Sequence, residues 1–150
     1  MANYVYAAGA METYGDKSSE ARLWRTRAKM YFDLHSYDFR IINPTNYYEI
    51  GANLHKEDLE VMRFDMRKVM NSDIILVNLK DLRKSVGTCD EILLAFLNNK
   101  PVIGFIEEDF ESKEELKKYV HNWKYLQIDR IETGENALEN ACKYIIEYYG

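Results

Sequence analysis

The sequence is poor in cysteine, proline and glycine, and it contains no long apolar run. Its two cysteines, Cys89 and Cys142, are too few and too isolated for a disulfide framework or a zinc site. No apolar stretch approaches membrane-spanning length, and the first residues lack the basic and long apolar segments of a signal peptide. We therefore expect a soluble, cytoplasmic protein that makes no contact with a membrane.

The chain also lacks an excess of basic residues. Its 20 lysines and arginines are outnumbered by 25 acidic residues, which gives a formal net charge of −5, and they are scattered rather than clustered. This charge argues against a nucleic-acid polymer as partner, whereas a small nucleoside or nucleotide remains open. With 150 residues and little glycine or proline, the chain is expected to form a single globular domain over residues 1–150.

Short apolar runs alternate with segments of helical periodicity along the whole chain. The runs predict five strands, at Asn3–Ala8, Phe39–Ile42, Ile74–Leu79, Lys100–Ile106 and Tyr125–Ile128. Helical spacing predicts helices over about 19–35, 55–71, from Thr88 onward, near 116–123 and over 135–149. Strands that alternate with helices predict an α/β fold, a doubly wound five-stranded parallel sheet of order 2-1-3-4-5 with helices on both faces.

The spacing of apolar residues also predicts which side of the first two helices is buried. In the first helix, the predicted buried residues are Leu23, Arg27, Met30, Tyr31 and Leu34. In the second helix, they are Leu59, Met62, Met66, Val69 and Met70. Asp65 lies on the flank of this second stripe, where a carboxylate must be paired or used. An ion pair with Arg63 or Arg67 and a catalytic role are both open.

The strand order places a binding crevice at one edge of the sheet. Strands 1 and 3 become neighbours there, and the chain reverses its winding between them. The loop after Tyr6-Ala7-Ala8-Gly9 then faces the loop before Gly87-Thr88. The small residues after strand 1 let a ligand approach the backbone closely. We therefore expect the functional site in this crevice.

Glu91 is the main candidate for chemistry in the crevice, and two interpretations of it stay open. It follows Thr88 by three residues, which is the spacing of a capping box at a helix start. Alternatively, the helix dipole holds the Glu91 carboxylate ionised, as a nucleophile that attacks an electrophilic carbon requires. The two roles are compatible with each other.

Tyr6 and Ser85 are weaker candidates. The Tyr6 hydroxyl, near the end of strand 1, can orient a carboxylate, but an ordinary core tyrosine explains it equally well. Ser85, with the backbone amides near Gly87 and Thr88, can hold an anion at a helix start or is simply a loop serine. The chain lacks metal-ligand spacing among its histidines, the Gly-x-Gly-x-x-Gly motif of dinucleotide-binding folds and the Gly-rich loop of nucleotide triphosphatases.

A set of short segments follows in order over nearly the whole chain. They are Val5–Met11, Trp24-Arg25, Ile42–Pro44, Asp65 with Ser72-Asp73, Ser85-x-Gly87-Thr88-x-x-Glu91 with Ala95, and Lys100–Ile103. Their joint order and spacing resemble the nucleoside 2-deoxyribosyltransferase family and the related deoxynucleoside 5′-monophosphate N-glycosidases. The resemblance implies a flavodoxin-like fold and cleavage of a 2′-deoxynucleoside N-glycosidic bond. It implies no metal ion and no redox cofactor.

The resemblance also implies roles for individual residues. Glu91 matches the family nucleophile, which attacks C1′ to give a covalent deoxyribosyl-enzyme. Asp65 matches the aspartate that assists the departing base, and Tyr6 matches the tyrosine that positions the nucleophile. The loop that lines the sugar and base pocket is matched by Gly9, Ala10 and Met11.

The chain departs from the family pattern before Glu91. Ser85 stands where many transferases carry an acid that contacts the sugar hydroxyls. A serine there is more similar to the monophosphate-cleaving branch, in which it meets the 5′-phosphate beside Gly87 and Thr88. Family members also complete the site with a residue from a neighbouring subunit. Its counterpart here is Asn122, which implies a homo-oligomer, a dimer or higher, with shared active sites.

The expected activity is therefore transfer of deoxyribose from one base to another, with a nucleoside and a free nucleobase as partners. Hydrolysis of (deoxy)nucleoside 5′-monophosphates to free base and sugar phosphate is the main alternative. Cleavage of NAD at its nicotinamide–ribose bond, also by a glutamate in a related fold, is a further possibility. So is a nucleotide-sensing module that keeps the pocket without turnover.

Overall fold

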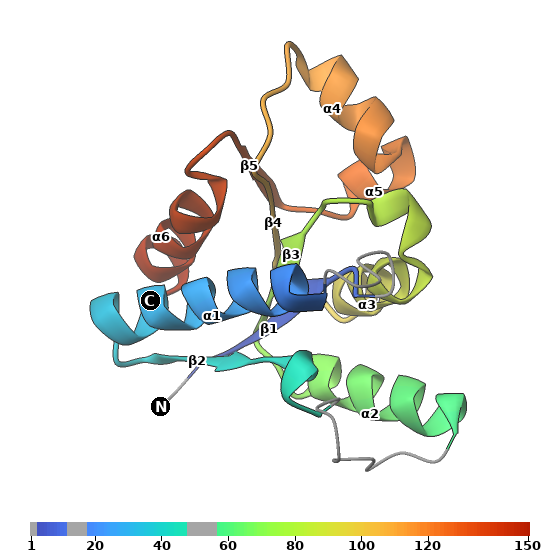
Figure 1. Ribbon diagram of the computed structural model, residues 1–150, viewed down its shortest axis with the longest axis vertical. Helices are drawn as coiled ribbons and strands as arrows, with labels where there is room; N and C mark the ends of the chain where they lie inside the picture. The colour runs from blue at the N-terminus through green and yellow to red at the C-terminus, as the bar shows by residue number, and fades with distance from the viewer. Residues whose placement is uncertain (1–2, 12–17, 48–56) are drawn as a thin grey trace.

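The core of the protein is a parallel β-sheet, shown in Figure 1. The computed structural model describes residues 3–11, 18–47 and 57–150. Within these residues the strands are β1 (Asn3–Gly9), β2 (Phe39–Ile42), β3 (Ile74–Asn78), β4 (Val102–Ile106) and β5 (Arg130–Thr133). They form one sheet in the order β2-β1-β3-β4-β5, and every neighbouring pair is parallel. The predicted fold class and strand order are confirmed.

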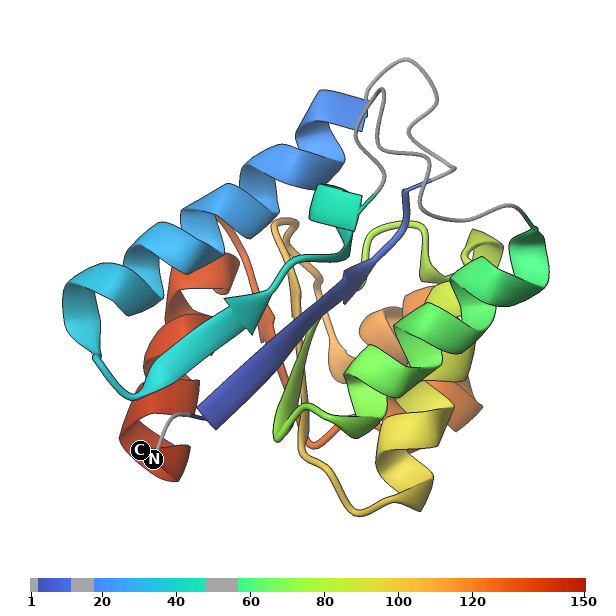
Figure 2. The ribbon, with the colours of Figure 1, turned by 90° about the horizontal axis from the view of Figure 1, so that it is seen from below.

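Helices cover both faces of this sheet, as predicted. Their bounds are α1 (Ser18–His35), α2 (Asp58–Met70), α3 (Val86–Leu97), α4 (Lys113–Val120), α5 (Asn122–Leu126) and α6 (Ala137–Tyr149), with short 3₁₀ turns at Pro44–Tyr47 and Leu82–Lys84. Figure 2 shows α1 and α6 on one face, and α2 and α3 side by side on the other. The predicted second helix starts at His55, which lies outside the described residues, and its described part begins at Asp58.

Two apolar layers hold the helices to the sheet. β3 and β4 are buried along their whole length, as central strands covered on both faces must be. Successive side chains of a strand point to opposite faces, so β1 contributes to both layers. Its Val5 and Ala7 pack with α1 and α6, whereas Tyr6 and Ala8 pack with α2 and α3. This alternation places the Tyr6 side chain on the α2 and α3 face.

The predicted fifth strand at Tyr125–Ile128 is wrong. Tyr125 belongs to α5, and the fifth strand is Arg130–Thr133, which pairs only with β4 at the edge of the sheet. An edge strand exposes part of its side chains, and here polar residues alternate with Ile131 instead of forming an apolar run. The apolar pattern of the sequence therefore indicated the segment just before the strand.

The predicted buried face of α1 is also wrong. Leu34 is 77% exposed, and Leu23 and Met30 are likewise exposed. The face that packs on the sheet consists of Ala21, Trp24, Arg25, Ala28 and Phe32. These positions also follow helical spacing, but alanine and arginine do not register as core residues in an apolar pattern. In α2, Val69 is buried, whereas Leu59, Met62 and Met70 are exposed.

The carboxyl ends of β1 and β3 lie side by side. The register pairs Gly9 with Asn78, so both strands end at the same edge of the sheet. The start of α3, which follows β3, lies near this edge together with Gly9 and Met11. The described residues contain no helix that is long and apolar enough to cross a lipid bilayer.

The corrected face of α1 predicts opposite stability effects for two neighbouring residues. Phe32 is 1% exposed and packs against Phe39, so Phe32→Ala should lower the free energy of unfolding by about 3–5 kcal/mol. Leu34→Ala should change it by less than about 0.5 kcal/mol because its side chain is exposed. Urea unfolding of both variants measures the difference. A loss in Leu34→Ala that equals or exceeds the loss in Phe32→Ala would favour the face expected from the sequence.

Candidate active site

A cavity of about 1010 Å³ opens at the carboxyl edge of the sheet, between the end of β1, α2 and the start of α3. Seven of the ten site residues predicted from the sequence line it, namely Gly9, Met11, Asp65, Ser85, Gly87, Thr88 and Glu91. The rest of its wall comes from Asp58, Leu59, Val61, Met62 and Met66 of α2, and from Lys84, Val86 and Asp90. Residues far apart in the sequence thus meet where the fold predicts a site.

The other three predicted residues lie outside the cavity lining. Tyr6 is buried in the layer beneath it, within hydrogen-bonding reach of Glu91. Ala10 is buried behind the cavity wall. Asn122 is an exposed residue at the start of α5, and it does not line the cavity of its own chain.

Glu91 lies on the face of α3 that is turned toward the sheet. The buried residues of this helix are Thr88, Glu91, Ile92 and Ala95, which recur at helical spacing. Ile92 and Ala95 pack in the apolar layer, and they hold the helix so that Glu91 comes to lie between that layer and the cavity. The residue is only 8% exposed, and its Oε2 has no hydrogen-bond partner in the described structure. An unpartnered buried carboxylate oxygen is costly unless a ligand uses it.

The expected capping box is not formed. α3 begins at Val86 with Ser85 at its N-cap position, so Thr88 and Glu91 already lie inside the helix. Ser85 Oγ and Thr88 Oγ1 instead form a hydrogen bond with each other at 2.6 Å. Because Glu91 is one turn further from the helix start than a capping box requires, capping does not explain its presence.

Burial, rather than the helix dipole, controls the ionisation of Glu91. The pKa of Glu91 is raised from 4.5 to about 7, chiefly by desolvation and also by the charges of Asp65 and Asp90. A hydrogen bond from the Tyr6 hydroxyl and the charge of Arg25 act in the opposite direction. The raised pKa argues against the expectation that the helix dipole holds this carboxylate ionised. Near neutral pH the protonated and the ionised form of Glu91 coexist.

Tyr6 and Asp65 approach Glu91 from two further elements. Burial and the charges of Glu91 and Asp65 raise the pKa of Tyr6 well above its ordinary value, so its hydroxyl remains a proton donor. Asp65 lies on α2, half-buried at the cavity wall. Its charge reaches both Glu91 and Tyr6. Two carboxyl groups at the cavity and a phenol in the layer beneath it thus act on one another, an arrangement suited to nucleophilic and acid–base chemistry.

The start of α3 offers a place for an anion at the same cavity. A Cβ added to Gly87 would meet nothing within 4 Å, so the backbone is open to a ligand there. Lys84 and Ser85 line the cavity beside it. Backbone amides at the start of a helix, a hydroxyl and a lysine are groups that bind phosphate.

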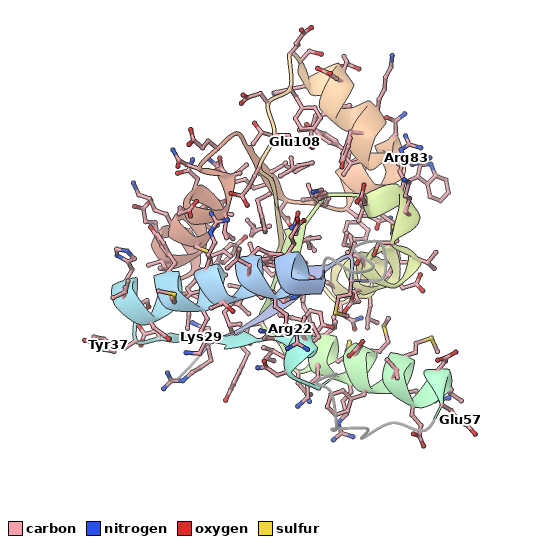
Figure 3. The ribbon with its side chains drawn as sticks, in the orientation of Figure 1. Arg22, Lys29, Tyr37, Glu57, Arg83 and Glu108 are labelled. Carbon is pink, nitrogen blue, oxygen red and sulfur yellow. The ribbon has the colours of Figure 1, made fainter. Side chains whose placement is uncertain are left out.

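The loop that carries Lys84 and Ser85 is fixed from outside the cavity. Arg83 donates from Nε to the carbonyls of Lys118 and Tyr119 at the end of α4, at 3.0 and 3.1 Å. Figure 3 labels Arg83 beside α4 and α5. The backbone amide of Asp81 donates to the Tyr119 hydroxyl at 2.9 Å. These contacts hold the chain between β3 and α3 in one conformation.

Sequence patterns missed one buried ionisable residue near this site. Arg25 of α1 is fully buried and donates to the carbonyls of Ala7, Gly9 and Ala21. The helical spacing of Ala21, Arg25, Ala28 and Phe32 contains the signal that would have placed it on the inner face.

The rest of the described structure offers fewer groups for binding or catalysis. A smaller hollow of about 310 Å³ lies on the α1 face near the ends of β3 and β4, and Arg27, Asn78 and Glu107 are among its lining residues. Arg27 is engaged there by Glu107 at 2.9 Å, and none of the predicted site residues lines this hollow. Over residues 3–11, 18–47 and 57–150, no group of three or more His, Cys, Asp and Glu side chains is placed to bind a metal ion.

Comparisons with known proteins reveal a shared three-dimensional fold and no match from sequence searches. No protein-family model and no curated protein matches the sequence. A conserved protein from Enterococcus faecalis V583 superimposes with a TM-score of 0.71 at 15% sequence identity, covering 95% of this chain and 98% of that one. The CMP N-glycosidase BcmB from Clostridium botulinum gives a TM-score of 0.60 at 13% identity, covering 97% of this chain and 99% of that one. The chain shares its fold with both proteins.

The raised pKa of Glu91 predicts a pH-dependent stability. Between about pH 4.5 and pH 7 the folded state holds a proton on Glu91 that the unfolded state releases, so the parent loses stability as pH rises. Glu91→Gln removes this penalty and should be more stable than the parent by on the order of 2 kcal/mol at about pH 8. The difference should shrink toward about pH 5. Urea unfolding at both pH values measures it.

Glu114→Gln is the control for this experiment, since Glu114 is an exposed carboxylate on α4 that does not line the cavity. It should change the free energy of unfolding by less than about 0.5 kcal/mol at either pH. A stability difference between Glu91→Gln and the parent that is the same at both pH values would contradict the burial argument.

Proposed function

We propose that this protein cleaves the N-glycosidic bond of a nucleoside or nucleotide, with Glu91 as the nucleophile. The observation that carries the proposal is the buried Glu91 carboxyl at the cavity between β1, α2 and α3, with Oε2 unpartnered in the described structure. The fold shared with a CMP N-glycosidase supports the same reaction class. The order of the sequence motifs supports it independently.

The reaction consists of two displacements at C1′. In the first, a Glu91 oxygen forms a bond to C1′ while the bond from C1′ to the base nitrogen breaks and its electron pair leaves with the base. Asp65, across the cavity on α2, assists by delivering a proton to the departing base. In the second, water or another base forms a bond to C1′ while Asp65 accepts its proton, the bond from C1′ to Glu91 breaks, and Glu91 leaves as a carboxylate. Two inversions retain the configuration of the sugar carbon.

The neighbours of Glu91 fit this sequence of steps. An ionised carboxylate stabilises the oxocarbenium-like charge that develops at C1′. The pKa of about 7 lets Glu91 ionise at neutral pH. The ionised carboxylate stays nucleophilic because few hydrogen bonds stabilise its negative charge. Tyr6, which stays protonated, orients the attacking oxygen from below. The backbone at Gly9 allows the sugar to lie close to β1.

Two acceptors of the sugar are proposed. The first is another base, which makes the protein a deoxyribosyltransferase. The second is water, which makes it a hydrolase of nucleoside 5′-monophosphates. The presence of Lys84 and Ser85 beside the open backbone of Gly87 favours a substrate with a phosphate group. The similarity to a CMP N-glycosidase points the same way.

The protein is also proposed to act as a homo-oligomer. Asn122 is exposed at the start of α5, and it follows His121, whose backbone adopts a positive φ of 85° that few non-glycine residues adopt. Its exposure makes it available to the cavity of a second copy. Sedimentation velocity tests this proposal, and a monomeric mass at working concentration would refute it.

The decisive assay follows the fate of the sugar. Deoxyinosine, thymidine, CMP and the deoxynucleoside monophosphates are each incubated with the protein, with and without free adenine, and separated by chromatography. A new deoxynucleoside identifies a transferase, and free base with sugar phosphate identifies a hydrolase. Release of nicotinamide from NAD in a parallel incubation identifies an NAD-cleaving enzyme. Binding without any turnover leaves only a nucleotide-sensing role.

Glu91→Gln should lower kcat at least about 10³-fold, because an amide cannot form the glycosyl-enzyme bond. The circular dichroism spectrum should be unchanged, since Gln has nearly the same shape. Glu114→Gln, an exposed carboxylate on α4, serves as the control and should retain parental kcat. Parental turnover in Glu91→Gln would contradict the nucleophile assignment.

Ser85→Ala should raise KM for nucleoside 5′-monophosphates about tenfold and leave KM for the corresponding nucleosides unchanged, because only the former carry the phosphate. Steady-state kinetics with matched pairs such as CMP and cytidine measures this ratio. Asp58→Asn, at the far side of the same cavity, is the control. Equal effects on both members of a pair would exclude a phosphate contact at Ser85.

A further inference from the structure

The end of β1 projects beyond its neighbour β2. β2 pairs with β1 only as far as Tyr6, opposite Ile42, whereas β3 continues alongside β1 to Gly9. In the described structure no strand therefore pairs with residues 7–9 on the β2 side. These residues are buried, and buried carbonyl groups require a hydrogen-bond donor.

The direction of the unpaired carbonyls follows from the hydrogen bonds near the start of β1. Asn3 bonds toward β2, since its amide donates to the carbonyl of Asp38 at 2.6 Å. Tyr4 bonds toward β3, since its carbonyl accepts from the amide of Asp73 at 2.8 Å. Backbone groups alternate in direction along a strand, so Ala7 and Gly9 point toward the β2 side.

Arg25 supplies the missing donors. Its Nε donates to the Ala7 carbonyl at 3.0 Å, and its Nη2 donates to the Gly9 carbonyl at 3.1 Å. Its Nη1 donates to the Ala21 carbonyl of its own helix at 2.8 Å, which fixes the side chain from behind. The guanidinium also lies over the ring of Trp24, with Cζ 4.5 Å from the ring centroid. The planar guanidinium of Arg25 thus donates the hydrogen bonds that a neighbouring strand would otherwise donate to the end of β1.

The positive charge of the buried Arg25 also acts on Glu91. The groups that act on Glu91 come from every element packed around it, namely Tyr6 from β1, Asp65 from α2, Asp90 from α3 and Arg25 from α1. Of these, Arg25 is the only cation. Its charge lowers the pKa of both Glu91 and Tyr6, against the effects of burial and of the two aspartates.

We propose that Arg25 is a positioning residue for the chemistry at Glu91, which it serves by fixing the end of β1 and by favouring the ionised carboxylate. Its contacts with Ala7 and Gly9 hold the strand that presents Tyr6 below Glu91 and Gly9 at the cavity. Its charge counteracts the burial of Glu91. The catalytic part of this inference rests on the proposed function, whereas the electrostatic part does not.

Two substitutions separate the effect of the hydrogen-bonding geometry of the Arg25 guanidinium from the effect of its positive charge. Arg25→Gln keeps a donor and removes the charge, and Arg25→Lys keeps the charge and removes the planar fork. Arg27→Gln is the control, because Arg27 lies on the same helix but is bound to Glu107 and Glu139. The titration of the Glu91 side-chain carboxyl is followed by ¹³C NMR in each folded protein, with Glu91→Gln used to assign the signal.

The titration midpoint of Glu91 should rise in Arg25→Gln, stay close to the parental value in Arg25→Lys and be unchanged in Arg27→Gln. A purely structural role for Arg25 would leave the midpoint where it is. An unmoved midpoint in folded Arg25→Gln would therefore overturn the inference. This measurement needs no substrate, so it is valid even if the parent cleaves none and the proposed function fails.

Where the parent turns over a substrate, the acid limb of kcat/KM should move with the NMR midpoint. Arg25→Lys should lower kcat about tenfold at every pH, because one ammonium group cannot hold the carbonyls of Ala7 and Gly9 together. If Arg25→Gln fails to fold, Arg25→Lys decides the question. A parental midpoint with reduced kcat supports the inference, and a parental kcat overturns it.

Discussion

Burial of one carboxyl group is the constraint on which the rest of this structure depends. Glu91 lies on the inner face of α3, and removal of its carboxyl from water raises its pKa to about 7. Such a group is tolerated because its neighbours compensate for the lost hydration. The Tyr6 hydroxyl lowers the pKa of Glu91 from below, and Arg25 contributes a positive charge from the opposite face of the sheet. The cavity in turn gives a ligand access to the carboxyl, so that binding can relieve the remaining cost.

Much of the fold could be predicted from the sequence because central strands are buried on both faces and leave an unmistakable apolar run. β1, β3 and β4 lie within a residue or two of their expected positions. The errors arose because an apolar pattern takes large apolar residues as buried and small or polar residues as exposed. β5 alternates polar residues with Ile131 at the sheet edge, and α1 buries two alanines and Arg25. Packing against the sheet, and not side-chain hydrophobicity alone, decided both.

The position of the candidate site was also predictable, since strand order alone brings the ends of β1 and β3 together. Glu91, Asp65 and Ser85 line the cavity that results. The ionisation of Glu91 was not predictable, because it depends on the start of α3 being at Val86 and on how deeply the following turn is buried. The contribution of Arg25 was equally hidden. It reaches the site through the backbone of β1, and sequence spacing carries no information on such contacts.

The two walls of the cavity differ in stiffness. On one side, Gly9 is wedged between neighbours, and a Cβ there would come within 3.1 Å of Trp24 and 3.2 Å of Asn78. On the other side, α2 presents Leu59, Met62 and Met66, whose unbranched or exposed side chains adapt their rotamers easily. A molecule bound in the cavity would therefore meet a rigid wall at Gly9 and an adaptable wall at α2. Such a cavity would be selective for the part of a ligand that lies against Gly9 and tolerant of differences in the part that lies against α2.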